Sequence, residues 1–303
     1  MSLMRGVLNT YLRLVEKPRM RQAKTAEKLR RNFARSAKYF FHAPRGTAIK
    51  KDSLPGGCEV LTVTPKQLSS DLVIFYIHGG GFIFGSPETH CAMMGQLAAR
   101  VDARVVMPRY RLAPEFPFPA ANDDVEKAYL ALVTSGVASS NIVIGGDSAG
   151  GGLTFSLLSQ ILAKGLPLPR GVFGFSPFVD FALQGASFKE NANQDVVLSA
   201  NRAAETVDMY LAGADRADPR LNVLQADFEG APPVWLCVGD TEILRDDAHA
   251  LKQLLKDCEV PVAFHEEHDL PHVWPIFHNL LPEARQTLDT LADWIKALPQ
   301  PEA

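Results

Sequence analysis

Hydrophobic and polar positions follow two alternating patterns from about residue 72 to the C-terminus. Short runs of apolar and β-branched residues, typical of buried strands, alternate with longer segments in which apolar residues recur at helical spacing. The strand-like runs cover residues 72–77, 104–107, 141–144, 171–175, 234–238 and 262–265, and the helical segments cover 88–101, 119–135, 149–164, 246–257 and 282–297. This alternation predicts an α/β fold with a mostly parallel central sheet and helices on both faces.

The first 45 residues differ from the rest of the chain in charge. They hold 12 Lys and Arg residues against two acidic residues, whereas the remainder holds 19 against 32. Leu8, Tyr11, Leu12 and Val15 recur at helical spacing, so one face of this segment is able to dock on the body of the protein. An Arg-rich, acid-poor start is also typical of an organelle-targeting sequence or of a helix on a membrane surface. The segment has neither a cleavage-like site of small residues nor an apolar stretch suited to secretion.

Length and composition are those of an ordinary globular domain. Of the 303 residues, 47% are hydrophobic and 21% are charged, so a full core in one domain is expected. Four cysteines are scattered without C-x-x-C spacing, which favours reduced thiols in the cytoplasm. The sequence has no apolar run of 18 residues and no aromatic nucleic-acid motif. We therefore predict neither stable membrane insertion nor a nucleic-acid partner.

The sequence G-D-S-A-G at residues 146–150 lies between a strand-like run and a helical segment. It contains the pattern G-x-S-x-G, in which a serine stands on a sharp strand-to-helix turn and acts as a nucleophile. The flanking glycines leave room for the chain to fold back. Isolated matches to this pattern are common by chance, so the prediction that Ser148 is a nucleophile depends on whether its partners are present.

The sequence H-G-G-G-F, which begins at His78, directly follows another strand-like run. Consecutive glycines let backbone N–H groups converge on one point, which is the geometry of an oxyanion hole. We predict that the N–H groups of Gly80, Gly81 and Ala149 form this hole, with His78 and Gly79 as supporting residues of the motif. A flexible loop or a phosphate cradle is the alternative, but the Walker pattern G-x-x-x-x-G-K-[ST] is absent.

Three carboxylates follow the strand-like run 234–238 and are candidates for a catalytic acid: Asp240, Glu242 and Asp246. A serine becomes a strong nucleophile only when a base takes its proton and an acid orients that base. In the fold that carries G-x-S-x-G, the acid and then the base follow the serine along the chain. The candidates lie at the carboxyl end of a predicted parallel strand, where ligands bind in open α/β folds.

Three histidines, His265, His268 and His272, occur in the last strand-like run and the loop after it. A metal site is one interpretation, because Glu266 and Glu267 lie between them. However, His265 falls within the strand-like run, and the H-E-x-x-H pattern of zinc peptidases is absent. We therefore expect a general base among these histidines, and neither a metal nor an organic cofactor.

Together these motifs resemble the hormone-sensitive-lipase-like family of carboxylesterases, in the branch with a G-D-S-A-G turn. The matching segments occur in the family's order at residues 78–82, 110–115, 146–150, 218–220 and 270–274. The resemblance implies an α/β-hydrolase fold with Ser148 as the nucleophile and His272, at the family's Pro-His position, as the base. It assigns no catalytic position to His265 or His268.

The candidate acid loop departs from the commonest family pattern. Many members carry Asp-Pro-Leu-x-Asp-Glu with the first Asp as the acid, whereas residues 242–247 read Glu-Ile-Leu-Arg-Asp-Asp. Aligning Leu244 and Asp246 puts Glu242 at the acid position, and members of the G-D-S-A-G branch are similar in using Glu there. We rank Glu242 first, Asp240 second and Asp246 third, since Asp246 suits the start of the following helix.

Several polar residues near these motifs are expected to brace loops rather than to react. We expect His78 to hold the glycine turn and Asp147 to hold the serine turn by hydrogen bonds. His90 is expected on the surface of a helix. Arg111 and Glu115, in the second of the matching segments, are expected to tie down a Pro-rich loop.

The resemblance also implies a helical cap over the active site. Residues 1–45 would form its first part and residues 181–216 its second part, with residues 46–303 as the α/β-hydrolase catalytic domain. Apolar side chains in or near the second part are candidates for lining an acyl or alcohol pocket, and packing of the cap on the body is the alternative role. These side chains are Phe178, Phe181, Phe188, Met209, Tyr210 and Leu211.

We predict a serine carboxylesterase that hydrolyses short- to medium-chain esters of small molecules through a Ser-His-Glu triad and an acyl-enzyme. One alternative is an amide hydrolase or deacetylase on the same scaffold. The other is a non-catalytic small-molecule-binding protein, but receptors similar to this family lack the catalytic histidine, and His272 is present here. The resemblance also suggests a homodimer formed through an edge strand or a helix near the C-terminus.

Overall fold

A central sheet organises the computed structural model, which describes residues 2–23 and 25–299. Over these residues the sheet has eight strands in the order β1-β2-β4-β3-β5-β6-β7-β8. The strands are β1 (Ala48–Leu54), β2 (Cys58–Thr64), β3 (Val73–Ile77), β4 (Arg104–Pro108), β5 (Ile142–Asp147), β6 (Gly171–Phe175), β7 (Val234–Gly239) and β8 (Val262–Glu267). All neighbours from β4 to β8 are parallel, while β2 is antiparallel to β1 and β4. The predicted α/β fold is confirmed.

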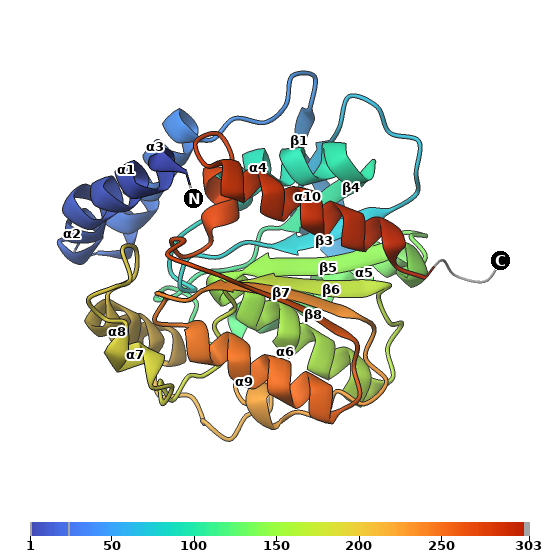
Figure 1. Cartoon of the computed structure of the whole chain (residues 1–303). Helices are drawn as coiled ribbons and strands as arrows, with labels where there is room; N and C mark the ends of the chain where they lie inside the picture. Colours follow the sequence, from blue (N-terminus) through green and yellow to red (C-terminus); the bar gives the residue numbers. More distant parts are fainter. Residues whose placement is uncertain (1, 24, 300–303) are drawn as a thin grey trace.

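Helices cover both faces of this sheet (Figure 1). One face carries α4 (Pro87–Val101) and α10 (Pro282–Ala297), and the other carries α5 (Ala120–Thr134), α6 (Ser148–Lys164) and α9 (Arg245–Asp257). Successive side chains of a strand point to opposite faces. On β3, Ile74 and Tyr76 therefore pack with α4 and α10, whereas Phe75 packs with α5 and α6.

The five helices predicted in the body of the protein are all present, and their ends lie within one residue of the prediction. The hairpin of β1 and β2 was not among the predicted strands. Nearly all of β1 is exposed, and its middle reads Lys50-Lys51-Asp52, so no apolar run marks it. Charged side chains are common on an edge strand because they discourage pairing with other chains. Short 3₁₀ turns complete the body at Pro55–Gly57, Ser139–Asn141, Val223–Gln225 and Trp274–Phe277.

The chain begins with a group of helices that we call the N-terminal helices. They are α1 (Leu3–Tyr11), the π-helical turn η1 (Leu12–Glu16), α2 (Lys17–Arg21) and α3 (Ala26–Phe40). The hydroxyl of Ser2 accepts the N–H of Arg5 and caps α1, and the hydroxyl of Thr25 accepts that of Lys28 and caps α3. The N-terminal helices lie at the same end of the sheet as α7 (Ser187–Glu190) and α8 (Ala200–Leu211) (Figure 1).

The N-terminal helices dock on the body through one apolar face. Leu8 and Leu12 are buried in the core, and full burial of such a side chain contributes about 1.5–3 kcal/mol. Val15, which has the same helical spacing, is 46% exposed, so its predicted burial is wrong. Ion pairs join the basic helices to the acidic body, for example Arg30 to Glu115 at 2.7 Å. None of the described helices is both long and apolar enough to cross a membrane.

Candidate active site

Ser148 stands on the turn between β5 and α6. Its φ of 52° lies in the left-handed region, which costs an L-residue about 1–2 kcal/mol and persists where the surrounding chain fixes it. A Cβ atom on Gly146 would lie 2.4 Å from the carbonyl oxygen of Gly150, and one on Gly150 would lie 2.2 Å from that of Ile77. The backbone segments of the turn are thus too close together for any side chain at residues 146 and 150. The turn holds Ser148 at the carboxyl ends of the central strands.

His272 and Glu242 form a buried pair between two neighbouring loops. Nδ1 of His272 lies 2.5 Å from Oε2 of Glu242, and the side chains are 6% and 1% exposed. Glu242 follows β7 and His272 follows β8, so the parallel pairing of these strands brings the two loops together. Burial disfavours the charged imidazolium, but the Glu242 carboxylate stabilises it more, and the pKa of His272 is raised above its ordinary value.

The second carboxylate oxygen of Glu242 has two further donors. The hydroxyl of Ser176 and the backbone N–H of Gly239 both donate to Oε1 at 2.7 Å. Ser176 is fully buried, and its oxygen also accepts the N–H of Val273, next to His272, at 3.3 Å. Sequence reasoning missed Ser176. The available signal was its position directly after β6, the strand between β5 and β7.

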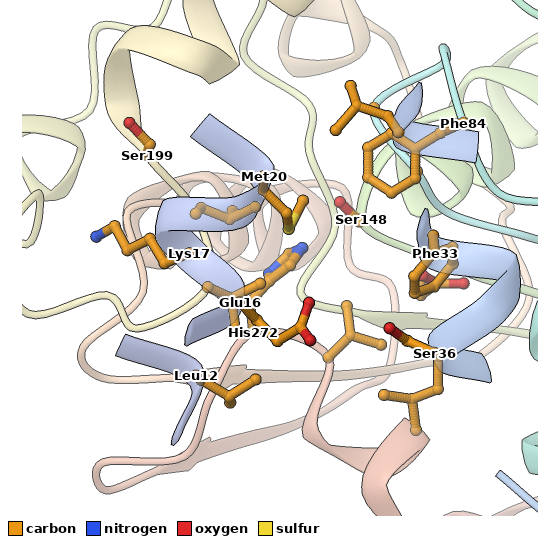
Figure 2. A pocket seen from close by; sticks show the side chains of 18 of the residues that line it. Leu12, Glu16, Lys17, Met20, Phe33, Ser36, Phe84, Ser148, Ser199 and His272 are labelled. Atoms are coloured by element: carbon orange, nitrogen blue, oxygen red, sulfur yellow. The ribbon is translucent and has the colours of Figure 1, made fainter. Parts of the chain in front are cut away.

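The other ring nitrogen of His272 lies at the cavity that Ser148 lines. Nε2 is buried and has no hydrogen-bond partner among the described residues. Figure 2 shows the side chains of Ser148 and His272 in this cavity. A buried polar atom without a partner costs free energy and is expected where a reacting group supplies the contact. With Nδ1 protonated and bound to Glu242, Nε2 is free to accept a proton.

Gly80, Gly81 and Ala149, the predicted oxyanion residues, line the same cavity. Among the described residues, the N–H groups of Gly80 and Gly81 have no hydrogen-bond acceptor. Ala149 lies in the first turn of α6, where N–H groups have no acceptor within the helix. Gly80 has a φ of 124°, and a Cβ atom there would lie 2.1 Å from the carbonyl oxygen of Phe84. The arrangement is suited to binding a negatively charged oxygen.

His78 and Gly79 brace the glycine turn. Nδ1 of His78 lies 2.9 Å from the carbonyl oxygen of Gly79, and the hydroxyl of Tyr110 donates to the carbonyl oxygen of His78 at 2.7 Å. The N–H of Gly79 donates to Asp147 at 2.9 Å. Burial, together with the neighbouring His90, lowers the pKa of His78 to about 3, so its ring is neutral near pH 7. The expected bracing role of His78 agrees with these contacts.

The expectation that His90 lies on a helix surface is wrong. It is 2% exposed, and its Nε2 lies 3.3 Å from Oδ2 of Asp147. Asp147 also accepts the hydroxyl of Tyr76 at 2.6 Å. Burial raises the pKa of Asp147, but His90 and the hydrogen bonds lower it more, so it lies below the ordinary value. A polar residue type misled the prediction, because His90 is on the face of α4 that packs against β3 and Asp147 supplies a partner for its Nε2.

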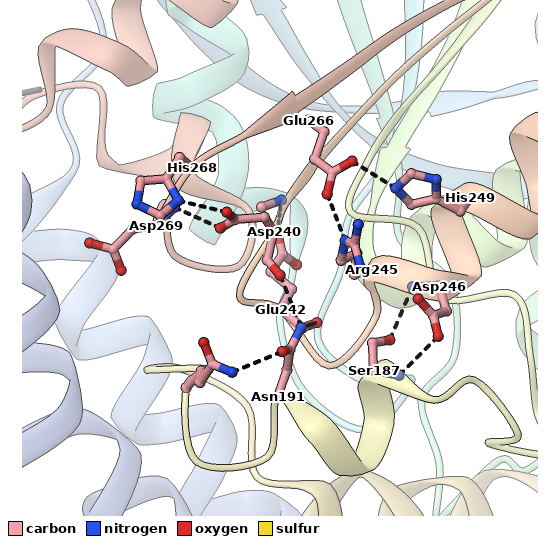
Figure 3. Close-up of polar contacts among 12 residues, drawn as sticks. Ser187, Asn191, Asp240, Glu242, Arg245, Asp246, His249, Glu266, His268 and Asp269 are labelled. Carbon is pink, nitrogen blue, oxygen red and sulfur yellow. Dashed lines mark hydrogen bonds and ion pairs between the residues drawn. The ribbon is translucent and has the colours of Figure 1, made fainter.

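The three histidines near the C-terminus have separate partners. His265 packs against a tryptophan ring on β7. His268 pairs with Asp240 at 2.6 Å on the surface (Figure 3). Asp246 lies in the first turn of α9, as expected, and accepts the backbone N–H of residue 187 at 2.9 Å. Of the three candidate acids, Glu242 is the one whose carboxylate contacts His272.

The cavity beside Ser148 has a volume of about 460 Å³ and a largely apolar lining. The N-terminal helices supply much of this lining, and Figure 2 shows several of their side chains around Ser148. These include Leu8, Leu12, Met20, Leu29 and Phe33. Helical spacing alone does not predict this lining, because an amphipathic pattern identifies a buried face without indicating whether it covers a core or a cavity.

Of the six apolar side chains that were candidates for lining a pocket, most pack on the body instead. Phe178 lines the cavity, but Phe181 and Tyr210 pack against Phe82, with ring centroids 5.5 and 4.0 Å away. Phe188, Met209 and Leu211 pack in the same core cluster. The alternative role, packing on the body, holds for these five side chains. The segment instead presents smaller and polar residues to the cavity, namely Ser199, directly before α8, and Arg202 and Thr206 within α8.

A serine on a strand-to-helix turn, at the carboxyl end of a central parallel strand and near a buried His–Glu pair, defines a serine hydrolase of the α/β class. A family model described as "alpha/beta hydrolase fold" matches residues 74–276. The chain belongs to this alpha/beta hydrolase family.

Named relatives narrow the class further. An acetyl-hydrolase of Streptomyces hygroscopicus is 34% identical over 241 residues, which are 80% of each chain. An esterase of Acinetobacter venetianus is 34% identical over 77% of each chain. The crystal structure of an esterase from the bacterial hormone-sensitive lipase family has a TM-score of 0.92 at 32% identity and covers 98% of this chain and 99% of that one. The predicted resemblance and enzyme class, a carboxylesterase-like or lipase-like serine hydrolase, are confirmed.

Proposed function

We propose that this protein is a carboxylesterase for short- to medium-chain esters of small molecules, with Ser148, His272 and Glu242 as its catalytic triad. One observation carries the proposal. The 2.5 Å contact with Glu242 fixes Nδ1 of His272, while Nε2, buried and without a partner among the described residues, lies at the cavity lined by Ser148. The printed activities of the relatives, acetyl-hydrolase and esterase, support the same reaction.

The proposed first half-reaction transfers the acyl group to Ser148. Nε2 of His272 takes the hydroxyl proton as the oxygen attacks the ester carbonyl carbon, which forms a tetrahedral intermediate. Glu242 stabilises the imidazolium, consistent with the raised pKa of His272. The intermediate collapses, the carbon–oxygen bond to the leaving group breaks, and His272 gives its proton to the departing alkoxide.

The second half-reaction hydrolyses the acyl-enzyme. His272 takes a proton from water, the resulting hydroxide attacks the acyl carbon, and Ser148 leaves with the proton returned by the imidazolium. Both half-reactions place negative charge on the former carbonyl oxygen. The N–H groups of Gly80, Gly81 and Ala149 are proposed to bind it, and one such donor typically contributes about 3–4 kcal/mol of transition-state stabilisation.

The cavity supports the proposed preference for short to medium acyl chains. Its volume of about 460 Å³ lies in the lower part of the range of small-molecule sites. We propose that residues 1–45 and 181–216 act together as a cap over a catalytic domain of residues 46–303. Both segments contribute to the lining of the cavity, which supports a joint role in enclosing substrate.

Two further expectations belong to this proposal. The first is a homodimer formed through β8, which is an edge strand of the sheet, or through α10 near the C-terminus. The second is a cytoplasmic location. Light scattering coupled to size exclusion tests the first expectation, since a monomeric mass at micromolar concentration contradicts it, and cell fractionation tests the second.

The testing experiment is hydrolysis of chromogenic esters from acetyl to hexadecanoyl, with wild type beside Ser148→Ala. We expect a short- to medium-chain optimum in wild type and loss of turnover in the variant. Full activity of Ser148→Ala would overturn the mechanism. An anilide of the same acyl group, assayed in parallel, measures the ester preference, and faster anilide hydrolysis would favour an amide hydrolase. Absence of wild-type turnover on every substrate would favour the binding-protein alternative.

A further inference from the structure

The peptide group that follows Glu242 is held at both of its polar atoms by one distant segment. The side-chain amide of Asn191 donates to the carbonyl oxygen of Glu242 at 2.8 Å and to that of Asp240 at 3.0 Å (Figure 3). Oδ2 of Asp195 accepts the N–H of Ile243 at 3.0 Å. The carbonyl of Glu242 and the N–H of Ile243 belong to the same planar peptide group and point in opposite directions. Rotation of this peptide group would therefore break bonds on both of its sides.

We call residues 187–198 the bracket segment. They comprise α7 and the chain that leads from it towards α8, and they contact the loop that carries Glu242. Asp195 is central to this segment. It is 2% exposed, and its other oxygen, Oδ1, accepts the N–H groups of Val197 and Leu198 at 2.8 and 2.7 Å. Three backbone donors thus fix one buried carboxylate, and an amide side chain has too few acceptor positions to replace it.

Lys17 connects the bracket segment to the N-terminal helices. It lies at the start of α2, and its Nζ donates to the carbonyl oxygens of Ala192 and Asp195 at 3.1 and 2.5 Å. Lys17 also lines the cavity near His272 (Figure 2). A continuous path of contacts therefore runs from α2, through the bracket segment, to the peptide group beside Glu242.

From these contacts we infer that Asp195 is a positioning residue for the proposed triad, and that Lys17 makes its action depend on docking of the N-terminal helices. The inference rests on the proposed function. When the N-terminal helices are docked, Lys17 holds the bracket segment, and Asp195 holds the Glu242–Ile243 peptide group so that the carboxylate of Glu242 faces His272. When they move away, the acid loop loses this support.

Charge gives Asp195 a second effect on His272. The carboxylates that raise the pKa of His272 are Glu242, Asp195 and Asp147, while Lys17 is the cation that faces Asp195. Burial raises the pKa of Asp195 itself. Removing the Asp195 charge should lower the pKa of His272, and the acidic limb of kcat/KM should then move to lower pH. A residue that only stabilised the fold would leave this limb in place.

The chain offers a matched control in Asp247. It is also a buried carboxylate that accepts two backbone N–H groups, those of Val179 and Asp180, at 2.8 and 2.9 Å. Burial raises the pKa of Asp247 to about 7. It contacts neither His272 nor the peptide group after Glu242. Asp247→Asn therefore imposes the same chemical change at a comparable depth without touching the proposed path.

The experiment compares Asp195→Asn with Asp247→Asn in the full chain. For Asp195→Asn we expect kcat to fall up to about 10²-fold with little change in KM, because misplacing a catalytic group has effects of this size. We also expect the acidic limb to move to lower pH, and the far-downfield proton resonance of Nδ1–H of His272 to shift or broaden. Asp247→Asn should leave the limb and the resonance unchanged. Wild-type-like values of kcat, limb and resonance in folded Asp195→Asn would overturn the inference.

Lys17→Met provides the second variant, because it keeps the apolar stem of a half-buried side chain and leaves the buried core of the fold intact. We expect kcat to fall and this loss to shrink in the Asp195→Asn background, since residues on one path are not additive. Equal losses in both backgrounds would refute the coupling, and Lys17→Met decides the question alone if Asp195→Asn fails to fold. Ser148→Ala distinguishes failure of the proposed function from failure of this inference. Retained turnover in Ser148→Ala rejects the proposed function. An inactive Ser148→Ala, together with Asp195→Asn and Lys17→Met variants of wild-type activity, rejects only this inference.

Discussion

Two histidine–carboxylate pairs on the same two loops have nearly identical geometry. Nδ1 of His268 lies 2.6 Å from Asp240, and Nδ1 of His272 lies 2.5 Å from Glu242. The first pair is 67% and 30% exposed, whereas the second is 6% and 1% exposed. Water and salt screen the exposed pair, while burial strengthens the attraction in the other. Distance alone therefore does not distinguish a surface ion pair from an acid–base pair suited to catalysis.

A third pair shows that burial is not sufficient either. His90 and Asp147 are both buried and also line the cavity. However, Nε2 of His90 contacts Asp147 at 3.3 Å, and its Nδ1 contacts the hydroxyl of Thr89 at 2.8 Å. Both ring nitrogens are thus occupied by the protein. His272 combines burial, a carboxylate on one nitrogen and a second nitrogen that is open to the cavity of Ser148.

The largest expected effect separates the two candidate acids. Glu242→Gln should lower kcat by about 10⁴-fold, because the amide cannot hold the required tautomer or stabilise the imidazolium. Asp240→Asn should change kcat by about twofold or less, as expected of an exposed pair. Steady-state kinetics on one chromogenic ester measures both variants. The reverse result would transfer the role of acid to Asp240.

The third pair predicts a loss of stability. His90→Ala removes one partner of a buried pair and should lower the free energy of unfolding by about 3 kcal/mol. Asp147 would keep its hydrogen bonds from Tyr76 and Gly79 but lose its contact with Nε2 of His90. Urea unfolding at pH 7 measures the change. A loss below about 1 kcal/mol, the range of surface pairs, would show that burial adds nothing at this site.

The pH dependence of the rate depends on His272. General-base catalysis needs its neutral form, and its pKa is raised above 6.5. We therefore expect kcat/KM to fall as pH drops through a midpoint above 6.5, with a slope of about tenfold per pH unit below it. His268→Asn should leave this midpoint unchanged. A midpoint that shifts in His268→Asn would contradict the assignment of His272 as the base. So would a wild-type midpoint well below 6.5.

The smallest expected effect concerns the exposed pair. His268→Ala should change the free energy of unfolding by about 0.2–1 kcal/mol, and the change should shrink at high salt. Asp240 also accepts the N–H of Asp269 at 2.8 Å, so its loop keeps a fixed point without His268. Thermal unfolding at low and high salt tests this prediction. A large loss of unfolding free energy that does not depend on salt would mean that the His268–Asp240 pair behaves like a buried pair.

Much of the fold is predictable from local patterns. The helices of the body follow from apolar spacing, and α10 begins and ends where the sequence predicted. The turn at Ser148 is predictable from its flanking glycines, because a Cβ atom at either position would clash with the backbone. The ranking of Glu242 above Asp240 came from a resemblance, because spacing alone allows either carboxylate to reach a histidine.

The failures share a physical cause, which is that chain neighbours do not reveal spatial neighbours. His90 is polar yet buried, because Asp147, which is distant in sequence, satisfies it. Tyr210 stacks on Phe82 and Phe181 stacks on Tyr210, so these two rings pack together rather than line the cavity. The contacts of Asp195 with the acid loop join segments 48 positions apart. No periodic pattern encodes such a contact.

The most direct test of the account is to trap and locate the reacting residue. The protein is treated with an alkyl phosphonate p-nitrophenyl ester, a stable mimic of the tetrahedral intermediate, and the modified peptide is sequenced by mass spectrometry. We predict one adduct per chain on Ser148, formed in Asp240→Asn at the wild-type rate and very slowly in Glu242→Gln and His272→Ala. Stoichiometric labelling at any other residue, or rapid labelling of Ser148 in His272→Ala, would contradict the proposed triad.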